Sequence, residues 1–340
     1  MEQAKRVAVL GAGSWGSALA LLLSGKGLET RLWARRAEFA EKLERERSNT
    51  RYLPGIAFPE TLQVTDSLAE ALIEVDLVVL ALPSQSLRAF AAALPKLLPS
   101  EVPLVNTAKG IEASTLMLPS QVLASELGPS YESRLTTIGG PSFAREVAEG
   151  VPSAVCVAGR DRETTLFVQE SMRTERFRVY STGDVAGVEL GGALKNVIAI
   201  AVGISDGLGF GNNTRAALIT RGLAEIARLA EPMGAHPMTL AGLSGMGDLV
   251  LTCTGDLSRN RHVGLELGRG RPLDDILASM TMVAEGVRTA ESAHRLAESM
   301  QVEMPIVTEV YRVLYEGKTP GEAVISLMNR PPRPEWVGRA

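Results

Sequence analysis

The stretch Arg6-Val-Ala-Val-Leu-Gly11-Ala-Gly13-Ser-Trp-Gly16-Ser-Ala-Leu-Ala-Leu-Leu-Leu23 decides the fold of the N-terminal half. A short apolar run is followed by a glycine-rich turn and then by residues with helical periodicity. Gly11 permits a tight turn, Gly13 lets a diphosphate approach the backbone, and Gly16 lets the helix pack closely on the strand. This order predicts a dinucleotide site at the start of the chain. The alternative is a turn of the same shape that binds nothing.

A second strand is expected over Glu29–Trp33, and it ends at Ala34-Arg35-Arg36. Enzymes that select NAD usually carry a carboxylate about 20 residues after the glycine motif, where it binds the ribose hydroxyls. A guanidinium group instead binds the 2′-phosphate of NADP with two hydrogen bonds. Arg35 and Arg36 therefore favour NADPH/NADP, with NADH still possible. The alternative is a solvated basic pair at the start of a surface helix.

Further buried strands are expected at 76–82, 102–107 and 134–138, with closing strands at 154–158 and 177–180. Apolar runs of this kind are typical of a parallel sheet covered on both faces. The turn after each strand lies at the carboxyl edge of the sheet, where open α/β folds bind their ligands. This places Pro83-Ser-Gln85, Ala108-Lys109-Gly110 and the loop from Gly139 to Ala144 together at one edge.

From about Asp184 onward the periodicity is helical, over 188–203, 215–231, 282–300 and 305–314. A helix-rich half after an α/β half indicates a second domain. The predicted fold class is therefore α/β: an N-terminal doubly wound domain of the Rossmann type (1–183), followed by a mostly α-helical domain (184–330). The Pro- and Arg-rich residues 331–340 are expected to form a loose tail.

The segment from Val188 to Gly203 is predicted to be an apolar helix with Lys195 at its centre. Small residues at four-residue intervals, Gly187, Gly191, Ala199 and Gly203, share the face of Lys195. Each interior glycine costs about 1 kcal/mol of helix stability, so the row indicates that something bulky comes close. A buried ammonium group loses hydration, which lowers its pKa toward the range useful for proton transfer. The alternative is a lysine that extends to solvent along its apolar stem.

Asp248 interrupts the apolar run of Gly245-Met-Gly-Asp-Leu-Val-Leu, and a buried carboxylate is costly without a partner. Ser258 is a good N-cap for the helical pattern that begins at Arg259. A helix start that offers backbone N–H groups, Arg259 and Asn260 suits a phosphate monoester. An ordinary capped surface helix is the alternative.

Composition narrows the classes of function. The chain has 340 residues, 45% hydrophobic residues and a formal charge of -4. That length allows two domains, and with no basic run no nucleic-acid partner is expected. No apolar run reaches the ~18 residues of a membrane span, and the N-terminus has no signal core, so a cytoplasmic protein is expected. Cysteine and histidine spacing predicts no metal site. Apolar stripes in the helical half are compatible with a homodimer.

The motifs taken together resemble the bacterial NAD(P)-dependent glycerol-3-phosphate dehydrogenases. The matching segments span most of the chain: 11–16, 106–110, 140–144, 189–196, 247–254, 258–260 and 283–287. The resemblance implies reduction of dihydroxyacetone phosphate to sn-glycerol 3-phosphate, the entry to glycerophospholipid synthesis, with Lys195 as catalytic proton donor and acceptor. It implies substrate contacts for Lys109, Gly140, Ser142, Lys195, Asp248, Ser258, Arg259 and Asn260. Together with the glycine motif and the arginine pair after the second strand, it implies cofactor contacts for Gly11, Gly13, Ser14, Trp15, Gly16, Arg35, Arg36, Lys109, Ala144, Arg259, Val283 and Glu285.

The sequence is also compatible with two rival functions. A β-hydroxyacid or ketopantoate-type reductase has the same two-domain plan but binds a carboxylate instead of a phosphate. A nucleotide-sensing binding protein would keep the fold without the chemistry, and the set of Lys109, Lys195, Asp248 and Arg259 argues against it.

Overall fold

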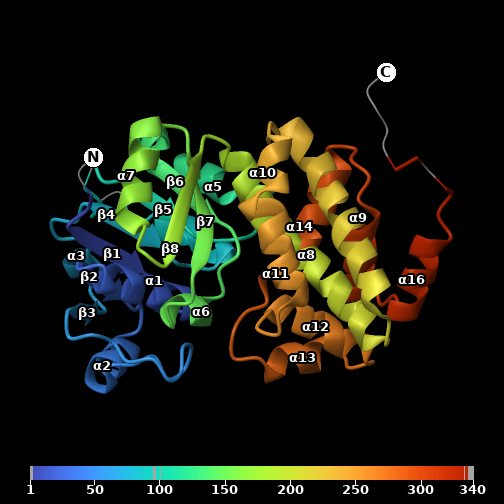
Figure 1. The fold of residues 1–340 in the computed structure, drawn as a ribbon, viewed down its shortest axis with the longest axis horizontal. Helices are drawn as coiled ribbons and strands as arrows, with labels where there is room; N and C mark the ends of the chain where they lie inside the picture. The colour runs from blue at the N-terminus through green and yellow to red at the C-terminus, as the bar shows by residue number, and fades with distance from the viewer. Residues whose placement is uncertain (1–2, 95–96, 100, 333, 336–340) are drawn as a thin grey trace.

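The computed structural model describes residues 3–94, 97–99, 101–332 and 334–335. An eight-stranded sheet occupies the N-terminal half, and the described part of the chain after Thr182 contains helices and no strand (Figure 1). The strand order is β3-β2-β1-β4-β5-β6-β7-β8, and β7 runs antiparallel to β6 while all other neighbours are parallel. The predicted fold class is therefore confirmed. The strands are β1 Arg6–Leu10, β2 Glu29–Trp33, β3 Leu62–Thr65, β4 Leu77–Leu80, β5 Leu104–Asn106, β6 Leu135–Gly139, β7 Ser153–Gly159 and β8 Phe177–Thr182.

Helices connect these strands, and helices form the regular structure of the C-terminal half as far as the structure describes it. Those of the sheet half are α1 Ser14–Gly25, α2 Ala37–Glu46, α3 Leu68–Ala71, α4 Leu87–Ala91, α5 Pro119–Leu127, α6 Ala144–Ala148 and α7 Arg162–Met172. Those of the helical half are α8 Val185–Gly207, α9 Asn212–Ala230, α10 Pro237–Ala241, α11 Asp248–Thr254, α12 Arg259–Gly268, α13 Leu273–Ser279, α14 Glu285–Ser299, α15 Pro305–Tyr315 and α16 Pro320–Met328. The limits of the two domains at residues 183 and 184 stay a prediction.

The predicted strands form, but two are shorter than expected. The apolar runs 76–82 and 102–107 yield β4 over Leu77–Leu80 and β5 over Leu104–Asn106. Pro103 lacks an N–H group and contributes only its carbonyl, which accepts from Val78 N at 3.0 Å. The described part of the expected tail is exposed and has no regular structure, and residues 333 and 336–340 lie outside the described residues.

The strand order reverses between the parallel neighbours β1 and β4: β2 and β3 follow β1 toward one edge of the sheet, and β4 and β5 continue toward the other. In open α/β sheets ligands bind at this point, beyond the carboxyl ends of the strands. The turn after β1 begins with Gly11, whose φ of 121° is rarely adopted by residues with a side chain. A Cβ atom at Gly11 would lie 2.4 Å from the carbonyl oxygen of Ala81, which follows β4. The glycine turn and the β4 turn therefore meet at the switch point.

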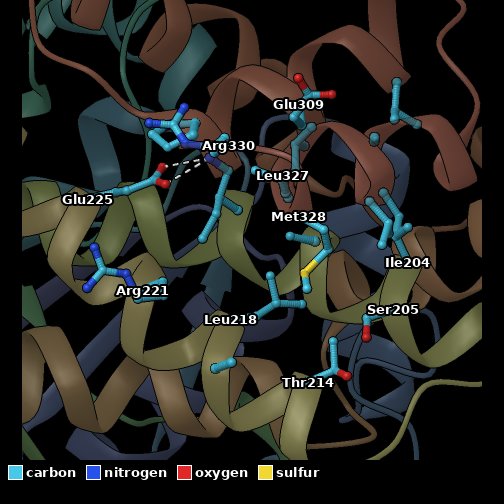
Figure 2. A pocket seen from close by; sticks show the side chains of 18 of the residues that line it. Ile204, Ser205, Thr214, Leu218, Arg221, Glu225, Glu309, Leu327, Met328 and Arg330 are labelled. Carbon is cyan, nitrogen blue, oxygen red and sulfur yellow. Dashed lines mark hydrogen bonds between the residues drawn. The ribbon is translucent and has the colours of Figure 1, made fainter. Parts of the chain in front are cut away.

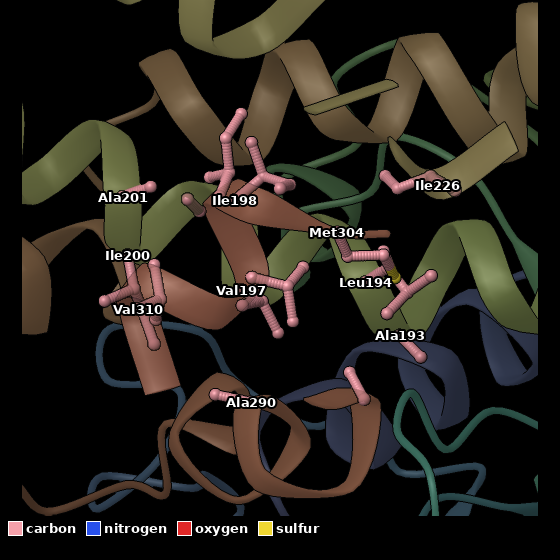
Figure 3. Packing of buried hydrophobic residues seen from close by; sticks show 14 of the residues in the cluster. Ala193, Leu194, Val197, Ile198, Ile200, Ala201, Ile226, Ala290, Met304 and Val310 are labelled. Atoms are coloured by element: carbon pink, nitrogen blue, oxygen red, sulfur yellow. The ribbon is translucent and has the colours of Figure 1, made fainter. Parts of the chain in front are cut away.

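Helix α8 is the core of the helical half. Its side chains Ala193, Leu194, Val197 and Ile198 are fully buried, and they pack among residues of α9, α14 and α15 (Figure 3). By length and composition alone α8 could span a membrane, with a mean hydropathy of 1.6, although the sequence shows no uninterrupted apolar run of that length. In the fold, 89% of the most apolar 18-residue stretch of α8 is buried inside the protein.

The row of small residues on α8 allows other segments of backbone to come close. A Cβ atom at Gly203 would lie 2.1 Å from the carbonyl oxygen of Arg261, and one at Gly191 would lie 2.4 Å from that of Ser244. On the facing helix, a Cβ atom at Gly264 would lie 2.1 Å from the carbonyl oxygen of Ile200. The bulky neighbour expected from the sequence is thus the backbone of α12 and of the π-helical turn Leu243–Gly247.

A cavity of about 610 Å³ lies between α9, α15 and α16, on the side of the helical half remote from the sheet (Figures 1 and 2). Its lining is largely apolar and includes Leu218, Val310 and Leu327, with Arg221 and Arg330 among the polar residues. None of the expected site residues lines it. The candidate active site is therefore elsewhere, where α8 meets the sheet.

Candidate active site

The ammonium group of Lys195 lies inside the protein and is paired with Asp248. Lys195 is 6% exposed and Asp248 is 1% exposed, so the alternative of a lysine that reaches solvent is excluded. The Nζ atom donates to Oδ1 of Asp248 and, at 2.9 Å, to Oγ1 of Thr252. The threonine hydroxyl in turn donates to the backbone carbonyl of Asp248 at 2.6 Å. These bonds fix the position of the lysine nitrogen.

A second ammonium group, that of Lys109, approaches the same carboxylate from the sheet. Its Nζ atom lies 2.8 Å from Oδ2 of Asp248 and 3.5 Å from the carbonyl oxygen of Gly140. Lys109 follows β5, and Asp248 begins α11, so the two halves of the chain meet at this carboxylate. The sequence predicted that a carboxylate inside this apolar run needs a partner, and Asp248 has two, Lys195 and Lys109.

The environment lowers the pKa of Lys195 to about 7. Loss of hydration is the main cause; the Asp248 carboxylate opposes it and the positive charge of Lys109 adds to it. Burial alone would raise the pKa of Asp248, but the two ammonium groups and their hydrogen bonds outweigh it, so this pKa is lowered. A neutral amine and an ammonium group are therefore both accessible at Lys195 near neutral pH.

Helix α12 begins beside the lysine helix. Ser258 is its N-cap, as expected, and accepts from the backbone N–H of Arg261 at 3.2 Å. Asn260 is 8% exposed; its Nδ2 donates to Oδ1 of Asn196 at 2.9 Å, and its Oδ1 accepts from Gly286 N at 2.9 Å. Arg259 is exposed at the helix start, where Nη1 donates to the carbonyl oxygen of Val283 at 2.7 Å.

Gly140 and Ser142 follow β6 at the same edge of the sheet. Gly140 has a φ of 123°, and a Cβ atom there would lie 3.0 Å from the Cα atom of Val155. The hydroxyl of Ser142 donates to the carbonyl oxygen of Gly140 at 2.9 Å, the oxygen that Lys109 also approaches. The Ser142 hydroxyl and the Lys109 ammonium thus share one backbone carbonyl.

The glycine turn has the geometry that a dinucleotide requires. A Cβ atom at Gly16 would lie 1.8 Å from the carbonyl oxygen of Gly11, which fixes the close packing of turn and helix. A Cβ atom at Gly13 would meet no protein atom within 4 Å, so protein packing does not require the missing side chain there. No side chain caps the start of α1, where Ser14 and Trp15 are the first residues. Free N–H groups at a helix start suit a diphosphate.

Arg35 and Arg36 lie exposed after β2, and Arg36 is the N-cap residue of α2. The Arg36 guanidinium lies 5.6 Å from the centre of the Phe39 ring. Glu285, the first residue of α14, accepts from the backbone N–H of Ser84 at 3.1 Å and so joins α14 to the β4 turn. Burial raises its pKa, although Ser84 N–H and the positive charges of Arg259, Lys109 and Lys195 act against this rise. Ala144 is the first residue of α6.

Four residues in or beside this site lie within the matching segments but received no role from the sequence: Thr252, Asn196, Asn106 and Glu189. Thr252 could have been found, because it lies four residues after Asp248 and therefore on the same helix face. The other three depend on contacts between distant segments, such as that of Asn260 with Asn196.

Family models and relatives of known name both match most of the chain. The family model described as NAD-dependent glycerol-3-phosphate dehydrogenase N-terminus matches residues 6–165, and the corresponding C-terminus model matches residues 184–325. The chain is 55% identical to a glycerol-3-phosphate dehydrogenase [NAD(P)+] of Geobacter metallireducens, over 97% of this chain and 99% of that protein. It is 56% identical to the protein of the same name from Geobacter sulfurreducens, over 96% and 97% of the two chains.

Among solved structures, the glycerol-3-phosphate dehydrogenase of Coxiella burnetii is 40% identical to this chain. It superposes with a TM-score of 0.91 and covers 96% of this chain and 99% of its own. The expectations of an oxidoreductase and of a nicotinamide cofactor are thereby confirmed at the level of the family. The chain belongs to the family of NAD(P)-dependent glycerol-3-phosphate dehydrogenases.

Proposed function

We propose that this chain reduces dihydroxyacetone phosphate to sn-glycerol 3-phosphate with NADPH or NADH, and that Lys195 is the proton donor. The observation that carries the proposal is the buried Lys195 amine, which is held by Asp248 and has a pKa lowered to about 7. An acid or base with a pKa near the working pH transfers protons most efficiently. Lys195 thus suits reduction and the reverse oxidation.

The nicotinamide, when bound, supplies the hydride or accepts it. During reduction the substrate carbonyl oxygen gains negative charge, which the Lys195 ammonium stabilises before it donates a proton to that oxygen. In the reverse direction neutral Lys195 accepts the hydroxyl proton. Asp248 and Thr252 hold the Nζ atom in place, and Lys109 adds positive charge on the other side of the carboxylate.

We assign the substrate phosphate to the start of α12, where Arg259 and the N–H groups after Ser258 offer donors. Binding energy from this remote group positions the reacting carbon. Asn260 fixes the helix start through its bonds to Asn196 and Gly286, besides any contact with substrate. The remaining substrate contacts are proposed for Lys109, Gly140, Ser142 and Asp248.

We assign the cofactor diphosphate to the turn from Gly11 to Gly16 and the start of α1, and the 2′-phosphate of NADPH to Arg35 and Arg36. The remaining cofactor contacts are proposed for Lys109, Ala144, Arg259, Val283 and Glu285. A supply of glycerol 3-phosphate for phospholipid synthesis, a cytoplasmic location and a homodimer belong to the same proposal.

The test is consumption of NADPH by the purified protein with dihydroxyacetone phosphate, measured by absorbance. The Lys195→Ala variant should lose nearly all turnover and still bind NADPH in a fluorescence titration, whereas Lys42→Ala, at an exposed surface lysine, should behave as wild type. Turnover within about tenfold of wild type would remove Lys195 from the mechanism. Activity with a 2-oxo carboxylate in place of the phosphate ester would contradict the proposed substrate.

A further inference from the structure

Glu189 is a buried carboxyl group on α8 whose partners belong to the sheet half of the chain. It is 4% exposed and lies before Lys195 on the same helix. Its Oε1 accepts from the backbone N–H of Ser120 at 2.9 Å, and its Oε2 accepts from the Ser120 hydroxyl at 2.7 Å. Oε1 also lies 3.4 Å from Nδ2 of Asn106. The carboxyl group thus joins α8 to the start of α5 and to the end of β5.

Asn106 shapes the turn that carries Lys109. Its Oδ1 accepts from the backbone N–H of Ala108 at 3.1 Å, and its Nδ2 lies 3.4 Å from the carbonyl oxygen of Ala108 and 3.2 Å from Oγ1 of Thr137. Lys109 is the next residue, and its stem lies against α8, with Cγ 3.5 Å from the Cβ position of Gly192. A continuous set of contacts therefore runs from Glu189 through Asn106 to Lys109.

The partners of Glu189 in the described chain are hydrogen-bond donors without charge. Burial raises its pKa to about 7, and the bonds from Ser120, Thr137 and Asn106 act against this rise. A buried carboxyl group without a cation is costly, and an apolar residue of similar size would avoid that cost. The proposed proton transfer does not use this group, which makes its hydrogen bonds with Asn106 and Ser120 and not with the proton-transfer residues Lys195, Asp248 and Thr252.

We propose that Glu189 is a positioning residue: through Asn106 it holds the turn of Lys109 against α8, so that the Lys109 ammonium stays on Asp248 beside Lys195. The catalytic meaning of this role rests on the proposed function, whereas the hydrogen-bond geometry does not depend on it.

The position of the Lys109 turn also affects the pKa of Lys195. The charged and titratable groups that act on Lys195, or on which Lys195 acts, are Asp248, Lys109, Cys253 and Glu285. Lys109 lowers the pKa of Lys195, and Glu189 is not among the causes of its shift. Release of the turn therefore acts through Lys109: when its ammonium group leaves Asp248, the pKa of Lys195 rises.

The experiment is an NMR titration of the full-length protein labelled with ¹³C at the lysine ε-carbon, with the Lys195 signal assigned through Lys195→Arg. No substrate or cofactor is added. Lys109→Met should raise the Lys195 inflection by about 1 unit, the size typical of a nearby like charge. Glu189→Ala should raise it to a similar extent, and the double variant should show no more than the Lys109→Met shift. An unchanged inflection in Glu189→Ala, or full addition of the two shifts, would overturn the proposal.

Two matched variants separate positioning from other effects. Glu189→Gln removes the charge but keeps an oxygen that accepts from Ser120 N and Asn106. The inflection of the Lys195 titration should therefore stay as in wild type. A shift equal to that of Glu189→Ala would refute the role of these hydrogen bonds. Ser120→Ala removes one bond to Glu189 and leaves the Asn106 contact, so it should also titrate as wild type. If Glu189→Ala does not fold, Asn106→Ala takes its place, with a raised inflection expected and an unchanged one contradicting the proposal.

The titration is independent of turnover. A wild-type protein that fails to consume NADPH with dihydroxyacetone phosphate would refute the proposed function and leave this result standing. An active wild type in which Glu189→Ala leaves the Lys195 titration unchanged would refute only the positioning role.

Discussion

The Asp248→Asn substitution tests whether one buried carboxylate sets the proton affinity of Lys195. Asp248 is 1% exposed, pairs with Lys195 and receives the Lys109 ammonium at 2.8 Å. Asparagine keeps the size of the side chain but removes its negative charge. The attraction that raises the pKa of Lys195 then disappears, while burial and Lys109, which lower it, remain. The pKa of Lys195 should therefore fall below 7.

The size of the effect depends on pH. With a pKa of about 7, about half of Lys195 is protonated at pH 7, and about a tenth at pH 8. An opposite charge in contact shifts a pKa by about 1–3 units, so loss of Asp248 places the pKa near ~5. The protonated fraction then falls from about a tenth to about a thousandth at pH 8, and from about nine tenths to about a tenth at pH 6. Reduction should slow roughly 100-fold at pH 8 but only about tenfold at pH 6.

The assay is the initial rate of NADPH consumption with saturating dihydroxyacetone phosphate between pH 5.5 and 8.5, values chosen to span the pKa by about 1.5 units on each side. Asp256→Asn is the matched control, because the Asp256 side chain is 98% exposed and pairs only with Arg261 among the described residues. Its profile should coincide with that of wild type. A loss in Asp248→Asn that is the same at every pH, or an inflection that stays near 7, would show that Asp248 does not tune Lys195.

Three further predictions concern binding and stability. Arg259→Ala should raise the KM for dihydroxyacetone phosphate by about 100-fold, because a charged donor to the phosphate is lost, and should lower kcat by less. An unchanged KM would show that the phosphate binds elsewhere. Replacing Arg35 and Arg36 together by alanine should lower kcat/KM for NADPH and leave kcat/KM for NADH nearly unchanged. An equal loss with both cofactors would contradict the assignment of the 2′-phosphate to this pair. Gly264→Ala should lower the free energy of unfolding by about 1–3 kcal/mol in urea, because its Cβ would lie 2.1 Å from Ile200 O, whereas Gly321→Ala, with open space around it, should not.

The sheet half was predictable because each of its signals is local. Gly11 and Gly16 are required by contacts within the turn and with the adjacent strand, so their spacing alone identifies the unit. The need of Asp248 for a partner was also local, since a carboxylate inside an apolar run is costly wherever the chain folds. The identity of its partners was not local, because Lys195 and Lys109 are 53 and 139 residues away in sequence.

The outcome of opposing electrostatic effects on Lys195 could not be predicted either. Asp248 raises the pKa and Lys109 lowers it, and the balance depends on the loss of hydration, which only the fold determines. The same holds for Glu189, whose partners Asn106 and Ser120 are 83 and 69 residues distant. Such contacts across the junction of the two halves leave no periodic signal in the sequence.

The glycine row of α8 connects packing to chemistry. With no Cβ atoms at Gly203 and Gly264, the backbones of α8 and α12 approach closely enough that a single added carbon would lie 2.1 Å from a carbonyl oxygen on either side. That approach brings the start of α12 to the lysine helix, where Asn260 bonds to Asn196, the neighbour of Lys195. The proposed phosphate site and proton donor are therefore held at a fixed separation by close backbone packing, together with the hydrogen bond between Asn260 and Asn196. Gly264→Ala should for this reason raise the KM for dihydroxyacetone phosphate as well as lower stability, and a KM equal to that of wild type in the folded variant would refute this coupling.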